Sequence, residues 1–156
     1  MPPARLARTI DAAFLDGAQV IVIDTPPNAD IAAREAVRAA DLILIPARAR
    51  AFDLHAVATT AALVESKAGQ AWLVFNALPA GARRLIADAS QAVTKMGLTV
   101  CPYTLTERAA FHHAPADGKV AAEADPAGKA AREINGLWDW LCQRAGMSAC
   151  RQEGAL

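Results

Sequence analysis

The chain has 156 residues and a mass of 16.3 kDa, which fits one domain of ordinary size. Alanine supplies 39 residues of a chain that is 54% apolar, so we expect a helix-rich structure with one modest core. Lys+Arg and Asp+Glu both number 16, which argues against nucleic-acid wrapping by bulk charge but leaves room for a local basic patch. The composition also excludes a disordered chain and a disulfide scaffold.

The cysteines and the longest apolar runs indicate a cytoplasmic protein. Cys101, Cys142 and Cys150 are widely spaced without a C-x-x-C motif, which predicts free thiols in a reducing compartment. A metal cluster of Cys101 with His112 and His113 would match no zinc-ligand spacing. No apolar run reaches the ~18 residues of a membrane span. Neither a signal peptide nor a membrane partner is therefore expected.

Helical and strand patterns alternate along the whole chain. In order, they predict helix 2–16, strand 19–24, helix 30–40, strand 41–46, helix 52–67, strand 71–76, helix 81–96, strand 98–101, helix 106–114 and helix 126–144. The four strand segments are short runs rich in Val, Ile and Leu, as is typical of strands buried on both faces. We therefore expect one α/β domain over 1–146, a mostly parallel sheet flanked by helices, and a flexible tail over 147–156.

Ligands of such sheets bind beyond the carboxyl ends of the strands, so chemistry is sought there. Asp24 follows an apolar strand directly, where an acid can hold Mg²⁺ through water or can cap its own loop beyond Pro26. Asn76 follows the third strand and can read a base edge or cap its loop. The three histidines are expected at the surface, and only one of Trp138 and Trp140 can face the core.

One phosphate-binding motif is absent from the sequence. No G-x-x-x-x-G-K-[ST] occurs, and the Gly-Lys pairs at Gly118 and Gly128 lack the upstream glycine and the following hydroxyl residue. No loop of this chain is therefore expected to cradle a triphosphate in the usual way.

Five segments in order resemble ParA-type partition ATPases, which share the MinD-like deviant-Walker class. The segments are VIVIDTPP at 20–27, AADLILIP at 39–46, FDL at 52–54, FN at 75–76, and the C-terminal stretch from ERAAF at 107–111 to GKAAREI at 128–134. The resemblance covers about residues 10 to 145. It implies a P-loop NTPase-like fold of the SIMIBI class.

The resemblance also implies a function and a set of site residues. Family members are dimeric ATPases that use ATP and Mg²⁺, bind DNA non-specifically, respond to a ParB-like or ribbon-helix-helix adaptor, and segregate plasmid or chromosomal loci. Asp24 would be the catalytic, Mg²⁺-associated acid. By the same resemblance, cofactor contacts would be made by Thr25, Asn76 and Pro102, and DNA contacts by Arg108, Lys129 and Arg132. The protein would be cytoplasmic and associated with the nucleoid.

The sequence departs from the family at its beginning. The family's first strand, its Lys-containing phosphate loop and its catalytic switch acid should precede Ala18, and only 17 residues do. We therefore expect a ParA-like domain truncated at its N-terminus, without ATP hydrolysis by this chain alone. Unpaired strand edges should favour a homodimer, a full-length ParA partner or a rearranged sheet. The alternatives are a non-catalytic ParA remnant that regulates or binds another protein, and an unrelated α/β protein.

Overall fold

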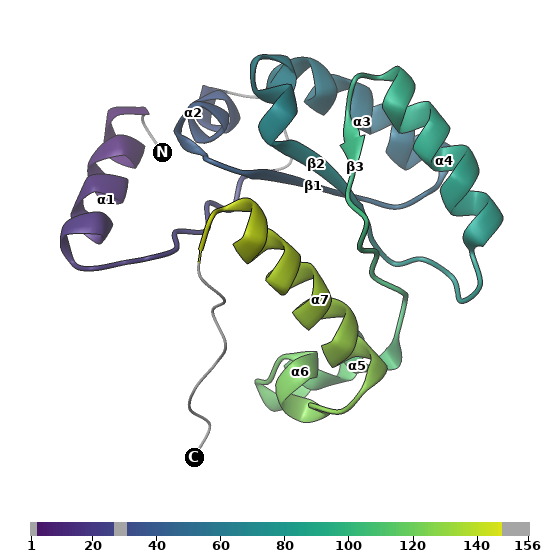
Figure 1. Ribbon diagram of the computed structural model, residues 1–156. Helices are drawn as coiled ribbons and strands as arrows, with labels where there is room; N and C mark the ends of the chain where they lie inside the picture. Colours follow the sequence, from purple (N-terminus) through teal and green to yellow (C-terminus); the bar gives the residue numbers. More distant parts are fainter. Residues whose placement is uncertain (1–2, 27–30, 148–156) are drawn as a thin grey trace.

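The computed structural model describes residues 3–26 and 31–147, which form a mixed α/β fold with a small parallel sheet flanked by helices (Figure 1). The strands are β1 (Ile43–Ala47), β2 (Ala71–Phe75) and β3 (Thr99–Val100). The helices are α1 (Pro3–Leu15), α2 (Ile31–Ala39), α3 (Ala51–Val64), α4 (Arg83–Lys95), α5 (Ala109–His113), α6 (Ala121–Ala124) and α7 (Lys129–Arg144). Two 3-10 turns, η1 (Glu65–Gln70) and η2 (Ala114–Asp117), complete the connections.

The sheet has the order β1-β2-β3, with both pairs of neighbours parallel. In its register Leu44 lies opposite Trp72, and Leu73 lies opposite Val100. Parallel neighbours need a crossover of a dozen or more residues, and α3 with η1, then α4, supply the two crossovers. The carboxyl ends of all three strands therefore lie at the same end of the sheet.

The side chains of β2 alternate between two apolar layers, because successive residues of a strand face opposite sides of a sheet. Leu73 and Phe75 are fully buried in the larger layer, on the face that α3 and α4 cover. Val74 belongs to the smaller layer with Trp140 and Leu137 of α7 on the opposite face. Figure 1 shows α7 beneath the sheet and α3 and α4 above it. The prediction that one of two tryptophans faces the core is confirmed, since Trp140 is buried.

The predicted strand at 19–24 is wrong. Residues 18–26 form a connection without regular secondary structure outside the sheet, and the sheet has three strands where four were expected. Val22 is 85% exposed, so the apolar run is not buried on either face. The physical reason is that a strand exists only through a hydrogen-bonded neighbour, and β1 pairs with β2 alone among the described residues.

Several helix boundaries also differ from the sequence predictions. The helix expected from residue 106 begins at Ala109, because Thr106 forms a bridge with Leu78 and its backbone N–H bonds to Glu133. The last helix begins at Lys129 rather than at Pro126, and the short helix α6 was not predicted. The predicted helix cap at Asp30 and the tail after Met147 lie outside the described residues. No helix in the described ranges has both the length and the apolar character needed to cross a membrane.

Candidate functional site

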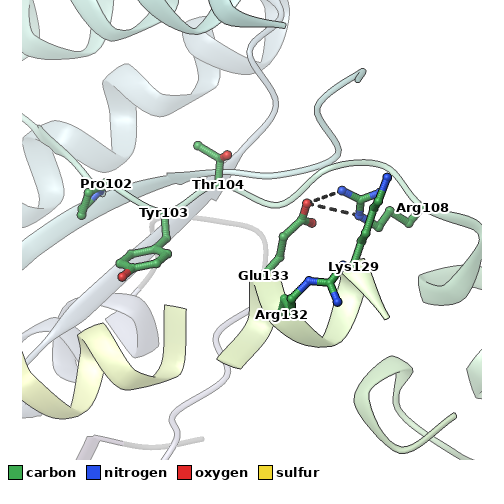
Figure 2. A pocket seen from close by; sticks show the side chains of 7 residues that line it. All are labelled: Pro102, Tyr103, Thr104, Arg108, Lys129, Arg132 and Glu133. Atoms are coloured by element: carbon green, nitrogen blue, oxygen red, sulfur yellow. Dashed lines mark hydrogen bonds and ion pairs between the residues drawn. The ribbon is translucent and has the colours of Figure 1, made fainter. Parts of the chain in front are cut away.

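A basic pocket lies beyond the carboxyl end of β3, where the following loop meets the first turns of α7 (Figure 2). Its volume is about 390 Å³. The pocket is lined by Pro102, Tyr103, Thr104, Arg108, Lys129, Arg132 and Glu133. The position agrees with the rule that parallel sheets present their ligand sites at the carboxyl ends of their strands.

Local sequence explains why the loop after β3 takes this course. Pro102 carries no backbone donor, so it cannot extend the hydrogen-bonded ladder beyond Cys101. Tyr103 then lies directly against Gly136 of α7. A Cβ atom at Gly136 would come within 2.7 Å of Tyr103 Cε1, so this contact requires glycine. The loop and the helix thereby approach closely enough to share a pocket.

Glu133 is the central acceptor of the pocket and joins the loop to α7. Its carboxylate accepts the backbone N–H of Thr106 at 3.0 Å and the Thr106 hydroxyl at 2.9 Å. The same carboxylate accepts Arg108 Nε at 3.2 Å and forms an ion pair with Arg108 Nη2 at 2.5 Å. Figure 2 shows both Arg108 bonds converging on one carboxylate oxygen. Four bonds to one side chain hold residues 106–108 in place and orient the guanidinium.

The pKa values of this pair move apart, in the direction that keeps both groups charged. Desolvation alone would raise the pKa of Glu133, but the hydrogen bonds from Arg108 and Thr106 together outweigh it and hold that pKa below its ordinary value. The hydrogen bond from Arg108 to Glu133 raises the pKa of the guanidinium. The pocket therefore contains a fixed carboxylate at neutral pH.

The remaining charges of the pocket are positive and face solvent. Arg132 donates to the carbonyl of Ala127, and both Arg132 and Lys129 are exposed. Lys129 makes no hydrogen bond or ion pair within the described parts of the chain. It is also the first residue of α7, where unpaired backbone N–H groups and the helix dipole favour anions. Three cations against one carboxylate leave the pocket with a net positive charge of two, which suits a phosphate.

Four of the site residues predicted from the sequence come together in this pocket: Pro102, Arg108, Lys129 and Arg132. Their sequence separation spans thirty positions, and the fold brings them to one face. Asp24 and Thr25 are exposed in the irregular segment 18–26, outside the sheet. The Mg²⁺ role of Asp24 stays a prediction, and its alternative role as a cap falls on residues outside the described ranges.

The structure gives Asn76 a bond within its own loop. Its Oδ1 accepts the backbone N–H of Ala77 at 2.8 Å, and Ala77 has a positive φ of 50°. This bond engages the Asn76 side chain within its own loop, although it reaches only the next residue and is not the two-residue Asx turn. The adenine contact of Asn76 stays a prediction.

Metal-ligating side chains do not gather in the part of the chain that the structure describes, where no group of three or more His, Cys, Asp or Glu residues could hold an ion. Cys101 and Cys142 are buried free thiols, as expected. Burial raises the pKa of the Cys101 thiol, against the opposing effects of the Tyr103 N–H and the charge of Arg144. His55, His112 and His113 are exposed, as predicted.

Sequence reasoning missed Glu133, which organises the pocket. Glu133 stands 27 residues after Thr106, on a helix whose charged face has no distinctive pattern, so no local signal links the two.

Comparison with known proteins adds no identification, since no family model matches the chain and no curated protein matches it.

Proposed function

We propose that this chain is a ParA-like partition protein that binds the DNA backbone through the basic pocket and does not hydrolyse ATP by itself. The observation that carries the proposal is the convergence of Arg108, Lys129 and Arg132 around one pocket. The resemblance to ParA-type proteins assigns the same three residues to DNA contacts. An adaptor of the ParB-like or ribbon-helix-helix class would act on the DNA-bound protein.

The exposure of the cations favours a polyanion over an enclosed small ligand. Lys129 and Arg132 are exposed, and the pocket opens to solvent rather than into the apolar core. A phosphodiester backbone can pass such a surface and contact the two side chains and the start of α7 together. Contacts to phosphate carry no information about the bases, so binding through these cations should be independent of DNA sequence.

DNA binding is tested by fluorescence anisotropy of two labelled duplexes of unrelated sequence, without nucleotide, over a range of salt concentrations. The double variant Lys129→Ala, Arg132→Ala should weaken binding equally for both duplexes. It should also reduce the slope of log K against log salt by about two, one for each lost phosphate contact. Since both side chains are exposed, the variant should keep the stability of the wild type.

The matched control removes two exposed basic residues elsewhere. Arg84 and Lys95 lie on α4, which covers the sheet face opposite α7. The variant Arg84→Ala, Lys95→Ala loses the same formal charge as the pocket variant, so an equal loss of binding in both would assign the effect to net charge and refute the pocket. No measurable binding by the wild type at low salt would refute the proposal outright.

A second candidate function is a non-catalytic module that binds intact ParA. The observation that favours it is the position of Asp24, exposed and apart from the sheet to which a nucleotide site would belong. It predicts co-purification with a full-length ParA and no DNA binding by the isolated chain. Steady-state release of phosphate from ATP and Mg²⁺ by the pure chain would contradict both candidates.

A further inference from the structure

The irregular segment 18–26 is an unpaired strand-forming sequence with exposed apolar residues. Val20, Ile21 and Val22 are 40%, 36% and 85% exposed, and no strand pairs with them in the described chain. Four consecutive β-branched residues, Val20 to Ile23, have the highest preference for a pleated sheet. Contiguous exposed apolar residues of this kind mark a surface that is covered by another element.

The edge of β1 away from β2 is open. The carbonyl of Ala47 accepts the backbone N–H of Asn76, so it points toward the β2 side. Because backbone groups alternate along a strand, the N–H and C=O of Leu44 and the C=O of Pro46 point to the opposite edge. No strand occupies that edge within the described ranges, and Leu44 is 36% exposed there. Such an edge is a template for a further strand.

Charge selects the direction in which the segment would pair with this edge. Asp24 directly follows the apolar run of the segment, and Arg48 and Arg50 follow β1. None of the three has an ion pair in the part of the chain described. Parallel pairing brings Asp24 next to Arg48, whereas antiparallel pairing would bring it next to Asp41 at the start of β1.

The same register also matches the apolar side chains. With Asp24 beside Arg48, Val20 stands beside Leu44 and Val22 stands beside Pro46. Neighbours in a parallel pair point to the same face, so the most exposed apolar residue of the segment would cover the exposed residues of β1. A slip of one residue would turn Val20 and Val22 to the other face and separate the charges.

We propose that the occupant of the β1 edge is the 18–26 segment of a second copy of this chain, added as a parallel strand. The chain's own segment leaves β1 unpaired in the structure, and a second copy carries both complementary features. The exchange is reciprocal, so a two-fold symmetric pair closes both open edges at once. This dimer is independent of the basic pocket and of DNA.

Sedimentation equilibrium of the full chain tests the association. Wild-type protein should form a dimer at micromolar concentrations, and Val22→Glu should weaken it at least about tenfold, since an exposed side chain of the monomer becomes buried. The matched control is Val120→Glu, which makes the same substitution at an exposed position before α6 and should leave the dimer unchanged. A wild-type chain that stays monomeric, or a dimer insensitive to Val22→Glu, overturns the proposal.

Charge exchange and cross-linking test the register and the source of the strand. Asp24→Arg should weaken the dimer, and adding Arg48→Asp should restore it. Chains carrying Val20→Cys, mixed with chains carrying Leu44→Cys, should form a disulfide-linked pair under oxidation, which only two separate molecules can do. A cross-link that forms only when both substitutions are in one chain, with the product monomeric, would assign the strand to the same molecule and overturn the dimer.

Discussion

Replacing the Glu133 carboxylate with an amide should lower stability and raise DNA affinity at the same time. Glu133→Gln keeps the size of the side chain, and its single amide oxygen can replace only Oε2, which accepts the backbone N–H of Thr106. The amide NH2 then stands in place of Oε1, which accepts the Thr106 hydroxyl and Arg108. The substitution removes the charge that pairs with Arg108 and leaves the guanidinium free to face the pocket. These two consequences have opposite signs, so one substitution separates the structural role of Glu133 from its electrostatic role.

The size of each effect can be worked from the contacts. The bond from the Thr106 backbone N–H changes from charge-assisted to neutral, and the bond from its hydroxyl loses its acceptor. The ion pair, whose side chains are 27% and 20% exposed, is lost as well. Because solvent screens this pair, the free energy of unfolding should fall by about 1 kcal/mol. The net charge of the pocket rises from two to three, which adds about one phosphate contact. DNA binding should then be about tenfold tighter at about 50 mM salt, and the salt slope should steepen by about 0.9.

Urea denaturation and duplex anisotropy, run on the same preparations, measure both quantities. Glu65→Gln is the control, because Glu65 lies in η1 before the start of β2, at the opposite edge of the sheet, and is exposed. It changes the net charge of the chain by the same amount. Unchanged or weaker DNA binding by Glu133→Gln, with the control unaffected, would refute the anion-binding role of the pocket. An equal gain in the control would attribute the effect to total charge.

Three further predictions concern the pocket and the core beside it. Gly136→Ala should displace the Tyr103 ring, which is 39% exposed and free to move, and should change the free energy of unfolding by less than about 1 kcal/mol in urea denaturation, because the helix propensity of alanine offsets the displaced contact; a loss above about 2 kcal/mol would contradict this freedom of the ring. The folded pKa of Glu133 is lowered, so the charged carboxylate stabilises the fold fully above its ordinary pKa of 4.5, and this stabilisation is lost as the pH falls through the folded pKa. The difference in the free energy of unfolding between wild type and Glu133→Gln should therefore shrink in that pH range. A difference that stays constant with pH would argue against the bonds to the carboxylate. The buried Cys101 thiol, whose pKa is raised, should react with a thiol reagent only after denaturant is added, and rapid reaction in buffer would contradict its burial.

Each predicted strand formed only where a neighbouring strand is present to pair with it. The runs at 41–46 and 71–76 became β1 and β2, because each has a partner to complete its ladder and a helix to cover it. The run at 19–24 has an equally apolar composition and forms no strand. Periodicity and composition report what a segment can bury, and the presence of a pairing edge is a property of the whole sheet. For this reason an apolar run predicts a strand correctly at 41–46, 71–76 and 98–101 and wrongly at 19–24.

For the site, the sequence predicted where the pocket lies but not which residue holds it together. The rule that ligands lie beyond the carboxyl ends of strands leads to Pro102 and its neighbours, and the pocket is there. The same rule applied to Asp24 depended on a strand that does not form. Glu133, the acceptor that assembles the pocket, accepts a bond from Thr106, 27 residues earlier in the chain. Helix and strand periodicities relate residues only a few positions apart, so they cannot predict this contact. Because the bonds of Glu133 fix the loop that carries Arg108, the cationic surface depends on a carboxylate that opposes the anion it would bind. The opposite signs expected for Glu133→Gln follow directly from that arrangement.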